Sequence, residues 1–175
     1  MGTLTVQTLQ APTSGANANK VIIPSGHTLD ASNGLTTPSG HVIQVVGTKF
    51  DGQSANVVAT TSTSFTDTGK SVTITPTSTS SKILVTICCQ LYTSATAHGD
   101  VAIFRGSTEI IRSSFNYDGA GASAGQGSLQ VLDSPATTSA TEYSIYIRSG
   151  SSSQTTTHNG SATSDSHLTA MEIAG

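Results

Sequence analysis

The chain has 175 residues, which is enough for one domain of ordinary size and a short appendage. Its net charge is −3, and its Lys and Arg residues are scattered singly, so nucleic acid is not an expected partner. No long apolar run and no basic leader is present, so we expect neither membrane insertion nor a secretory signal. Leu, Ile, Val and Phe make up only about a fifth of the chain, which predicts that the protein completes its burial by packing against copies of itself.

The N-terminal part contains an internal repeat. Ile23–Leu29, with the sequence IPSGHTL, is echoed by Thr37–Ile43, with the sequence TPSGHVI. Each Pro fixes φ for a corner and each Ser-Gly allows a tight bend, while the apolar residues that follow can enter a short strand. Together with Leu4–Leu9, this pattern predicts that residues 1–47 form a narrow β stalk, in which strands from several chains wind around one axis.

Two histidines occupy matching positions in the repeats. On a threefold axis, His27 and His41 would each form a ring of three imidazoles, which can bind a transition metal. The alternative, which we favour, is that each is a solvated or hydrogen-bonded residue at a turn. His98, His158 and His167 are interpreted as surface or edge residues, and no cofactor or metal is expected.

Residues 48–175 show a different sequence pattern, in which short strand candidates are separated by polar turns. The spacing predicts an all-β head, an antiparallel β-sandwich or jelly roll. The expected strands are Asn56–Thr60, Ser64–Thr66, Lys70–Thr75, Ser81–Leu91, Asp100–Arg105, Thr108–Ser113, Gly127–Leu132, Glu142–Arg148 and His167–Ile173.

Period-2 alternation places the core within these strands. In Ser71–Thr75 and Tyr143–Ile147 the apolar residues alternate with polar ones, so one face is expected to be buried. The adjacent Cys88 and Cys89 lie in the most apolar strand and point to opposite faces, so they cannot easily bond to each other. We interpret both as small buried hydrophobic residues, and two cysteines exclude a disulfide framework.

Two segments do not resolve into strands. Asp118–Gly127 and Ser149–Thr157 are rich in small residues and are expected to be flexible surface loops. The functional alternative is that they form an adaptable contact surface on a rigid sandwich. Asn116 and Tyr117, beside the first segment, are the residues there that have the area and polar groups to anchor a ligand.

No catalytic residues are assigned. Serines are so numerous that a Ser/His/Asp triad can be drawn in many ways, and no Gly-x-Ser-x-Gly elbow singles one out. The acidic residues are spread thinly, and no P-loop, GxGxxG or HExxH motif occurs. The sequence therefore predicts a protein that is not an enzyme.

Five stretches of the chain resemble a family of bacteriophage virion proteins of the tail-fibre or spike type. They are Gly40–Val46, Thr63–Gly69, Ser71–Val85, Gly127–Pro135 and Leu168–Ile173. The resemblance implies a homotrimer with a jelly-roll head similar to the C1q and tumour-necrosis-factor class, in which the last strand lies centrally in one sheet near the trimer axis. It further implies that this strand alternates, with one of two sets, Leu168, Ala170 and Glu172 or Thr169, Met171 and Ile173, entering the sandwich and the other facing neighbours.

The function that the resemblance implies is a fibre or spike of the virion that contacts the host surface. Its partners would be copies of itself, other virion proteins through the N-terminal segment, and a receptor or glycan of the host. The alternative is a capsid decoration protein bound to the outer shell. Either protein would be assembled in the bacterial cytoplasm and located in the virion.

Overall fold

The computed structural model describes residues 13–15, 25–26, 38–52, 54–94, 98–115, 121–159 and 165–175. The chain divides into two compact units, Met1–Thr36 and Thr37–Gly175. Most of the first unit lies outside the described residues, including His27 and Leu4–Leu9. The stalk therefore stays a prediction, and its expected boundary after residue 47 falls inside the first strand of the second unit, β1 (Val42–Phe50).

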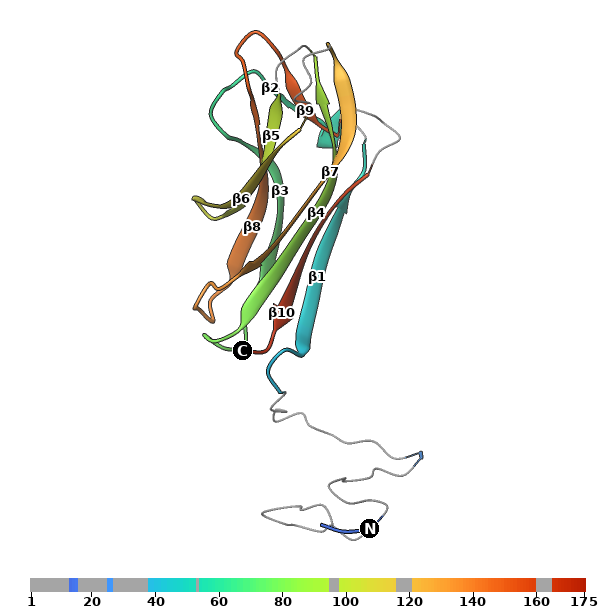
Figure 1. Ribbon diagram of the computed structural model, residues 1–175, viewed down its shortest axis with the longest axis vertical. Coiled ribbons are helices and arrows are strands. Elements are labelled where there is room, and N and C mark those ends of the chain that lie inside the picture. The colour runs from blue at the N-terminus through green and yellow to red at the C-terminus, as the bar shows by residue number, and fades with distance from the viewer. Residues whose placement is uncertain are drawn as a thin grey trace. The chain divides into compact units, whose positions relative to one another are not determined.

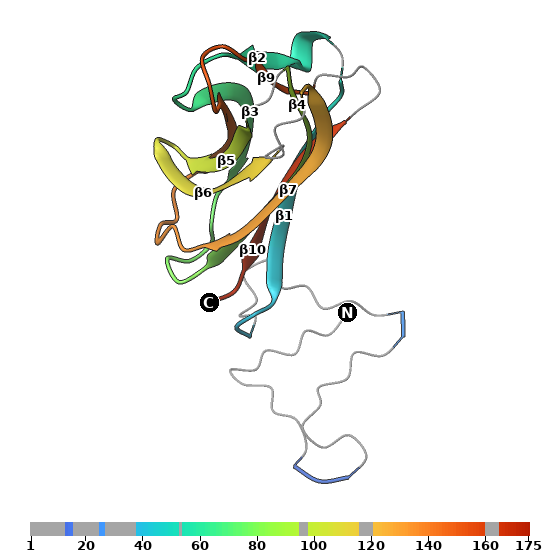
Figure 2. The same cartoon turned by 45° about the horizontal axis from the view of Figure 1, so that its top comes forward.

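The second unit is an all-β sandwich of two antiparallel sheets (Figure 1). The other long strands are β3 (Thr66–Ile74), β4 (Lys82–Thr93), β5 (Gly99–Arg105), β6 (Thr108–Phe115), β7 (Ser123–Asp133), β8 (Thr141–Ser149) and β10 (Ser166–Ile173). The first sheet has the order β1-β10-β4-β7, and the second sheet has the order β3-β8-β5-β6. This is the jelly-roll order, so the expected fold class is confirmed, and Figure 2 shows the two layers from a second angle.

Two short strands extend one end of the first sheet. β10 pairs with Lys82–Cys88 of β4, and β9 (Thr156–His158) pairs with Leu91–Thr93 further along β4. β2 (Val58–Thr60) pairs with β9 from outside, and a single 3-10 turn, η1 (Ser54–Asn56), precedes it. We call this β2–β9 pair the cap.

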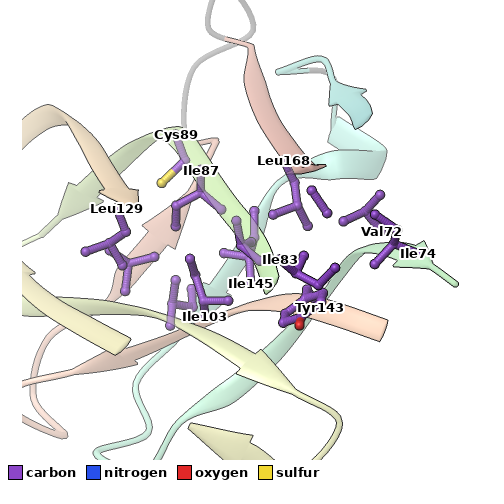
Figure 3. Close-up of a cluster of buried hydrophobic side chains, with 14 of the residues drawn as sticks. Val72, Ile74, Ile83, Ile87, Cys89, Ile103, Leu129, Tyr143, Ile145 and Leu168 are labelled. Carbon is purple, nitrogen blue, oxygen red and sulfur yellow. The ribbon is translucent and has the colours of Figure 1, made fainter. Parts of the chain in front are cut away.

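The core lies between the sheets and is built from alternate residues of both (Figure 3). As the alternation predicts, β3 and β8 bury one face, and β4, β5, β7 and β10 supply the rest. The buried apolar residues include Val72, Ile74, Ile83, Val85, Ile87, Cys89, Val101, Ile103, Leu129, Tyr143, Ile145, Ile147, Leu168 and Ala170. Full burial of each large aliphatic side chain stabilises the fold by about 1.5–3 kcal/mol, so these few residues account for most of the hydrophobic stability.

The last strand lies inside a sheet, as expected, while its expected place near a trimer axis stays a prediction. β10 runs between β1 and β4 in the first sheet, and its burial alternates along its length. The expected alternation is confirmed, and the structure shows that Leu168, Ala170 and Glu172 are the set buried in the sandwich.

Glu172 is a buried carboxylate that ties three segments together. Its Oε1 accepts hydrogen bonds from the backbone N and Oγ1 of Thr77 and from Oγ of Ser81, each at 2.7 Å, and its Oε2 accepts one from Nε2 of Gln44 at 2.6 Å. Burial by itself would raise the pKa of this carboxyl, but the donors outweigh burial and hold the pKa below its usual value. Glu172 therefore joins β10 to β1 and to the turn between β3 and β4 as a charged group.

Asp133 joins the two sheets. The carboxylate, at the end of β7 in the first sheet, accepts hydrogen bonds from Nη1 of Arg105 and from the hydroxyl of Tyr143, both at 2.6 Å. Arg105 and Tyr143 belong to neighbouring strands of the second sheet. Burial, followed by the contact with Asp133, raises the pKa of Tyr143, so the phenol keeps its proton and remains a donor.

Several expected boundaries are wrong. Ser64–Thr66 is not a separate strand, because β3 begins at Thr66 and continues through a bulge between Asp67 and Lys70. β7 begins at Ser123, inside the expected loop Asp118–Gly127. The expected loop Ser149–Thr157 likewise contains the start of β9. In both loops, small polar residues carry strand pairing because a neighbouring strand supplies the hydrogen bonds.

Candidate interaction surface

The outer face of the first sheet carries a continuous aliphatic row. Val45 of β1 pairs with Met171 of β10, Met171 pairs with Leu84 of β4, and Leu84 pairs with Leu132 of β7. Their chain neighbours point into the sandwich, so these four side chains face outward. Four strands therefore contribute one line of apolar side chains across the outside of the sheet.

A second pair widens this row. Val42 and Ile173 pair with each other beside the row. We call the six residues of the row and this pair the aliphatic face: Val42, Val45, Leu84, Leu132, Met171 and Ile173. Val42, Val45 and Leu132 are 54%, 55% and 51% exposed, and with Ile43 they are the exposed large hydrophobic residues of the described part of the chain.

The rest of the same surface is polar. The next row along the strands holds Gly47, Thr169, Thr86 and Gln130, and the row after it holds Lys49, His167, Cys88 and Ser128. Nε2 of Gln130 donates to Oγ1 of Thr86 at 3.1 Å, and Nζ of Lys49 lies 2.7 Å from Oδ2 of Asp165. The apolar character is thus confined to one end of the sheet, next to hydrogen-bonding groups, as at protein–protein interfaces.

The outer face of the second sheet carries an aromatic cluster instead. Phe104 of β5 stacks on Tyr146 of β8 with ring centroids 4.1 Å apart, and Phe65 meets Phe104 edge-on at 5.5 Å. The Arg148 guanidinium lies 4.8 Å from the centroid of Phe65, and its Nε donates to Oδ2 of Asp100 at 2.6 Å. We call Phe65, Phe104 and Tyr146 the aromatic cluster.

The cysteines differ from what was expected in one respect. Cys88 and Cys89 point to opposite faces, but only Cys89 is buried, whereas Cys88 is exposed on the outer face of the first sheet. Among the described residues no second layer packs on this face, so an outward residue of β4 is accessible there. Burial is the main cause that raises the pKa of the Cys89 thiol to about 12.

The histidines separate into exposed and buried ones. His41 and His167 are exposed. His158 was interpreted as a surface or edge residue, which is wrong. The side chain is fully buried, because β9 is paired on both edges, and His158 lies between its partners Leu91 of β4 and Val58 of β2. No cluster of three or more potential metal ligands occurs among the described residues, and His27, one of the two expected axial positions, lies outside them.

Sequence reasoning placed a possible anchor at Asn116 and Tyr117, which lie outside the described residues. It named Met171 and Ile173 in one of the two sets that could face neighbours, but it missed Val42, Val45, Leu84 and Leu132. A signal was present, because β1 is apolar at both odd and even positions, a pattern typical of strands buried on both faces. The aromatic cluster had no local signal, since its members are far apart in sequence.

None of the helices in the described part of the chain is long and apolar enough to cross a membrane. No family model matches the chain, and no curated protein matches it. Eighteen chains of solved structures match, among them the crystal structure of the infectious bursal disease virus VP2 subviral particle. That match has 14% identity and a TM-score of 0.38, and it covers 94% of this chain but 45% of that chain. The class of the protein is defined by its strand order, which is that of a jelly-roll β-sandwich.

Proposed function

We propose that the protein is a non-enzymatic structural component of a bacteriophage virion, a trimeric fibre or spike whose jelly-roll heads associate through the aliphatic face. The observation that carries this proposal is the outward row from Val45 to Leu132. Exposed aliphatic side chains that are contiguous over several strands mark an interaction site, whereas scattered ones do not. The virion role itself comes from the sequence resemblance.

Self-association through this face agrees with the energetics of the chain. A jelly roll with a sparse core gains stability when outward aliphatic residues are removed from water. β10 lies next to the centre of this face, so copies arranged around one axis would each present Met171 and Ile173 to their neighbours. A symmetric homo-oligomer uses one patch of each copy in this way.

The native mass of the purified protein tests the proposal. Light scattering should give three times the chain mass of 17.7 kDa. The double variant Val45→Ser with Leu132→Ser should give a single-chain mass, because each replacement removes about 1.5 kcal/mol or more of buried apolar contact from every interface. Both positions face outward, so the fold should survive, and Thr73→Ala on the outer face of the second sheet is the control that keeps the wild-type mass.

A truncated chain separates the two units. It must begin at Thr37 and not at the expected boundary after residue 47, because β1 begins at Val42, and Gly40 and His41 exchange backbone hydrogen bonds with Ala174. A threefold mass that survives this truncation places the contacts in the head. A single-chain mass for both the full and truncated proteins would exclude the proposed assembly.

The fibre and the capsid decoration protein differ in what they do on the particle. A fibre or spike is expected to bind host cells as an isolated head, with weak contacts that gain from multivalency. A decoration protein is expected in many copies per particle, and its removal should weaken the shell. Counting copies per particle and measuring binding of labelled heads to host cells distinguishes the two.

A further inference from the structure

The aromatic cluster brings together three residues of types that are rare in this chain. The chain has only four Phe and four Tyr, and three of these eight lie together on the outer face of the second sheet. Most other outward positions of that sheet hold Ser, Thr or charged residues, such as Ser71, Thr73 and Glu142. Apolar rings placed on an otherwise polar outer face point to a contact made from outside.

The cluster is also held in place before any ligand arrives. Ala102, which pairs with Tyr146, and Asp100, which is bound by Arg148, are buried although they lie on the outer side of the sheet. Asp100 fixes Arg148, Arg148 covers Phe65, and Phe65 contacts Phe104. Rigid side chains lose little entropy on binding, so the surface is pre-organised.

Polar groups surround the rings. Oδ1 of Asp67 accepts a hydrogen bond from the backbone N of Gly69 at 2.8 Å, and the Asp67 carboxylate also contacts Tyr146, whose pKa is raised chiefly by burial and then by Asp67. Glu142 accepts hydrogen bonds from Ser71 and Ser144. Arg148 has five N–H donors, of which Nε is used by Asp100. Partly exposed rings bordered by carboxylates and a guanidinium form a surface that is both apolar and hydrogen-bonding.

We propose that the outer face of the second sheet binds a neutral carbohydrate, with the C–H face of a sugar ring packed on Tyr146 and Phe104 and its hydroxyls bonded by Asp67 and Arg148. Ligand sites of this kind combine aromatic rings with a few placed polar groups. This inference rests on the proposed function for the exposure of the surface, because association through the aliphatic face leaves the opposite side of the sandwich uncovered.

Charge selects a neutral sugar over an anionic one. Arg148 is paired with Asp100, and Arg112 lies 3.6 Å from Glu109. Asp67 and Glu142 have no basic partner among the described residues, which leaves an excess of negative charge beside the rings. A uronic or sialic acid would be repelled there, whereas neutral hexoses and N-acetylhexosamines would not.

The test uses the full chain and an array of neutral oligosaccharides of glucose, galactose, mannose and N-acetylglucosamine, with uronic and sialic acid oligosaccharides beside them. We expect binding to at least one neutral oligosaccharide and none to the acidic ones. Saturation-transfer NMR with the best neutral binder then measures the affinity in solution. Tyr146→Ala should weaken binding roughly tenfold, the value of one stacked ring.

Further variants keep the test decisive. Tyr92→Ala removes an aromatic ring from the outer face of the first sheet and should bind as the wild type does. If Tyr146→Ala fails to fold, Asp67→Asn and Arg148→Gln test the polar groups without removing a ring. Absence of binding to every neutral oligosaccharide by a folded protein would overturn the inference, as would affinity unchanged by Tyr146→Ala. Binding of a basic peptide at the same residues in place of sugar would also overturn it and assign a protein partner.

Different results would contradict the carbohydrate site and the proposed assembly. The NMR affinity is measured per chain and does not depend on multivalency, so the monomeric Val45→Ser, Leu132→Ser variant should bind in solution as the wild type does. A wild-type monomer that binds sugar would contradict the assembly alone. A wild-type trimer that binds no sugar would contradict the carbohydrate site alone.

Discussion

At the scale of single residues, Glu172 shows how a carboxylate becomes a structural element. Its four donors are worth about 1.5–3 kcal/mol each when they bond to a charge, but burying that charge offsets much of the sum. Replacing it by Gln leaves the donors of Thr77 and Ser81 facing an amide. We expect Glu172→Gln to lower the free energy of unfolding by about 3 kcal/mol at neutral pH.

The pH dependence of this loss identifies its cause. Because the folded-state pKa of Glu172 lies below the ordinary value of 4.5, its stabilisation is present above that value and disappears as pH falls through the folded pKa. Denaturant unfolding of wild type and Glu172→Gln should therefore converge in acid. Glu142→Gln, an exposed carboxylate with two weaker donors, is the control and should cost less than about 0.5 kcal/mol. A difference that persists unchanged in acid would mean that shape, and not charge, causes the loss.

His158 predicts a second loss of stability in acid, this time from a group that the fold holds neutral. Burial, and after it the charge of Lys70, lowers the pKa of His158 from 6.5 to about 4, while the backbone of Asn56 acts in the other direction. Neither ring nitrogen makes a hydrogen bond of ordinary geometry. The unfolded chain therefore takes up a proton first as pH falls, and about 3 kcal/mol of stability should be lost between pH 6.5 and pH 4.

Replacing His158 by leucine distinguishes its contribution to the acid loss of stability from the contributions of other titrating groups. His158→Leu should flatten the loss of unfolding free energy between these two pH values, because it removes the proton that the unfolded state gains. His167→Gln, at an exposed histidine of β10, should keep the wild-type slope. Urea titrations at several pH values measure both variants, and an unchanged slope in His158→Leu would exclude His158 as the group responsible.

At the scale of elements, the sequence was most informative where one face of a strand is buried. The alternation in β3 and β8 identified Val72, Ile74, Tyr143, Ile145 and Ile147 as core residues. Successive side chains of a strand point to opposite faces, so a strand buried on one face has an apolar residue at every second position. The layering into a jelly roll followed from the number and spacing of such strands.

What the sequence could not show depends on pairing between distant segments. β9 is made of Thr-Thr-His, and it is a strand because β2 and β4 pair with both of its edges. In the sequence, Gly69 is typical of a turn. In the structure it lies in the bulge between Asp67 and Lys70 with a φ of +66°, and strand β3 continues through it. Likewise, the aliphatic face exists only through the register of four strands, and the aromatic cluster only through the pairing of β5 with β8 beside Phe65, the residue before β3. Local patterns predicted the layers, and non-local pairing determined both surfaces.

At the scale of the whole molecule, the two sheets present different chemistry to the outside. The first sheet is aliphatic at one end, which favours a partner that excludes water. The second sheet offers rings beside charges, which favours a polar ligand. Between them, Asp133 ties the layers together through Arg105 and Tyr143, so the two surfaces are held on one rigid body. The proposed assembly uses this division, because one side would hold the neighbouring copies while the other stays free.

If assembly stabilises the head, unfolding must depend on protein concentration. For a trimer that dissociates as it unfolds, each tenfold dilution should lower the melting temperature by about 2–3 °C, because dissociation is favoured by mass action. Reversible calorimetric scans over two decades of concentration measure this shift. The Val45→Ser, Leu132→Ser variant should melt at one temperature at every concentration, and lower than the wild type. Reversible melting of the wild type that is independent of concentration would show that the aliphatic face contributes nothing to stability in solution.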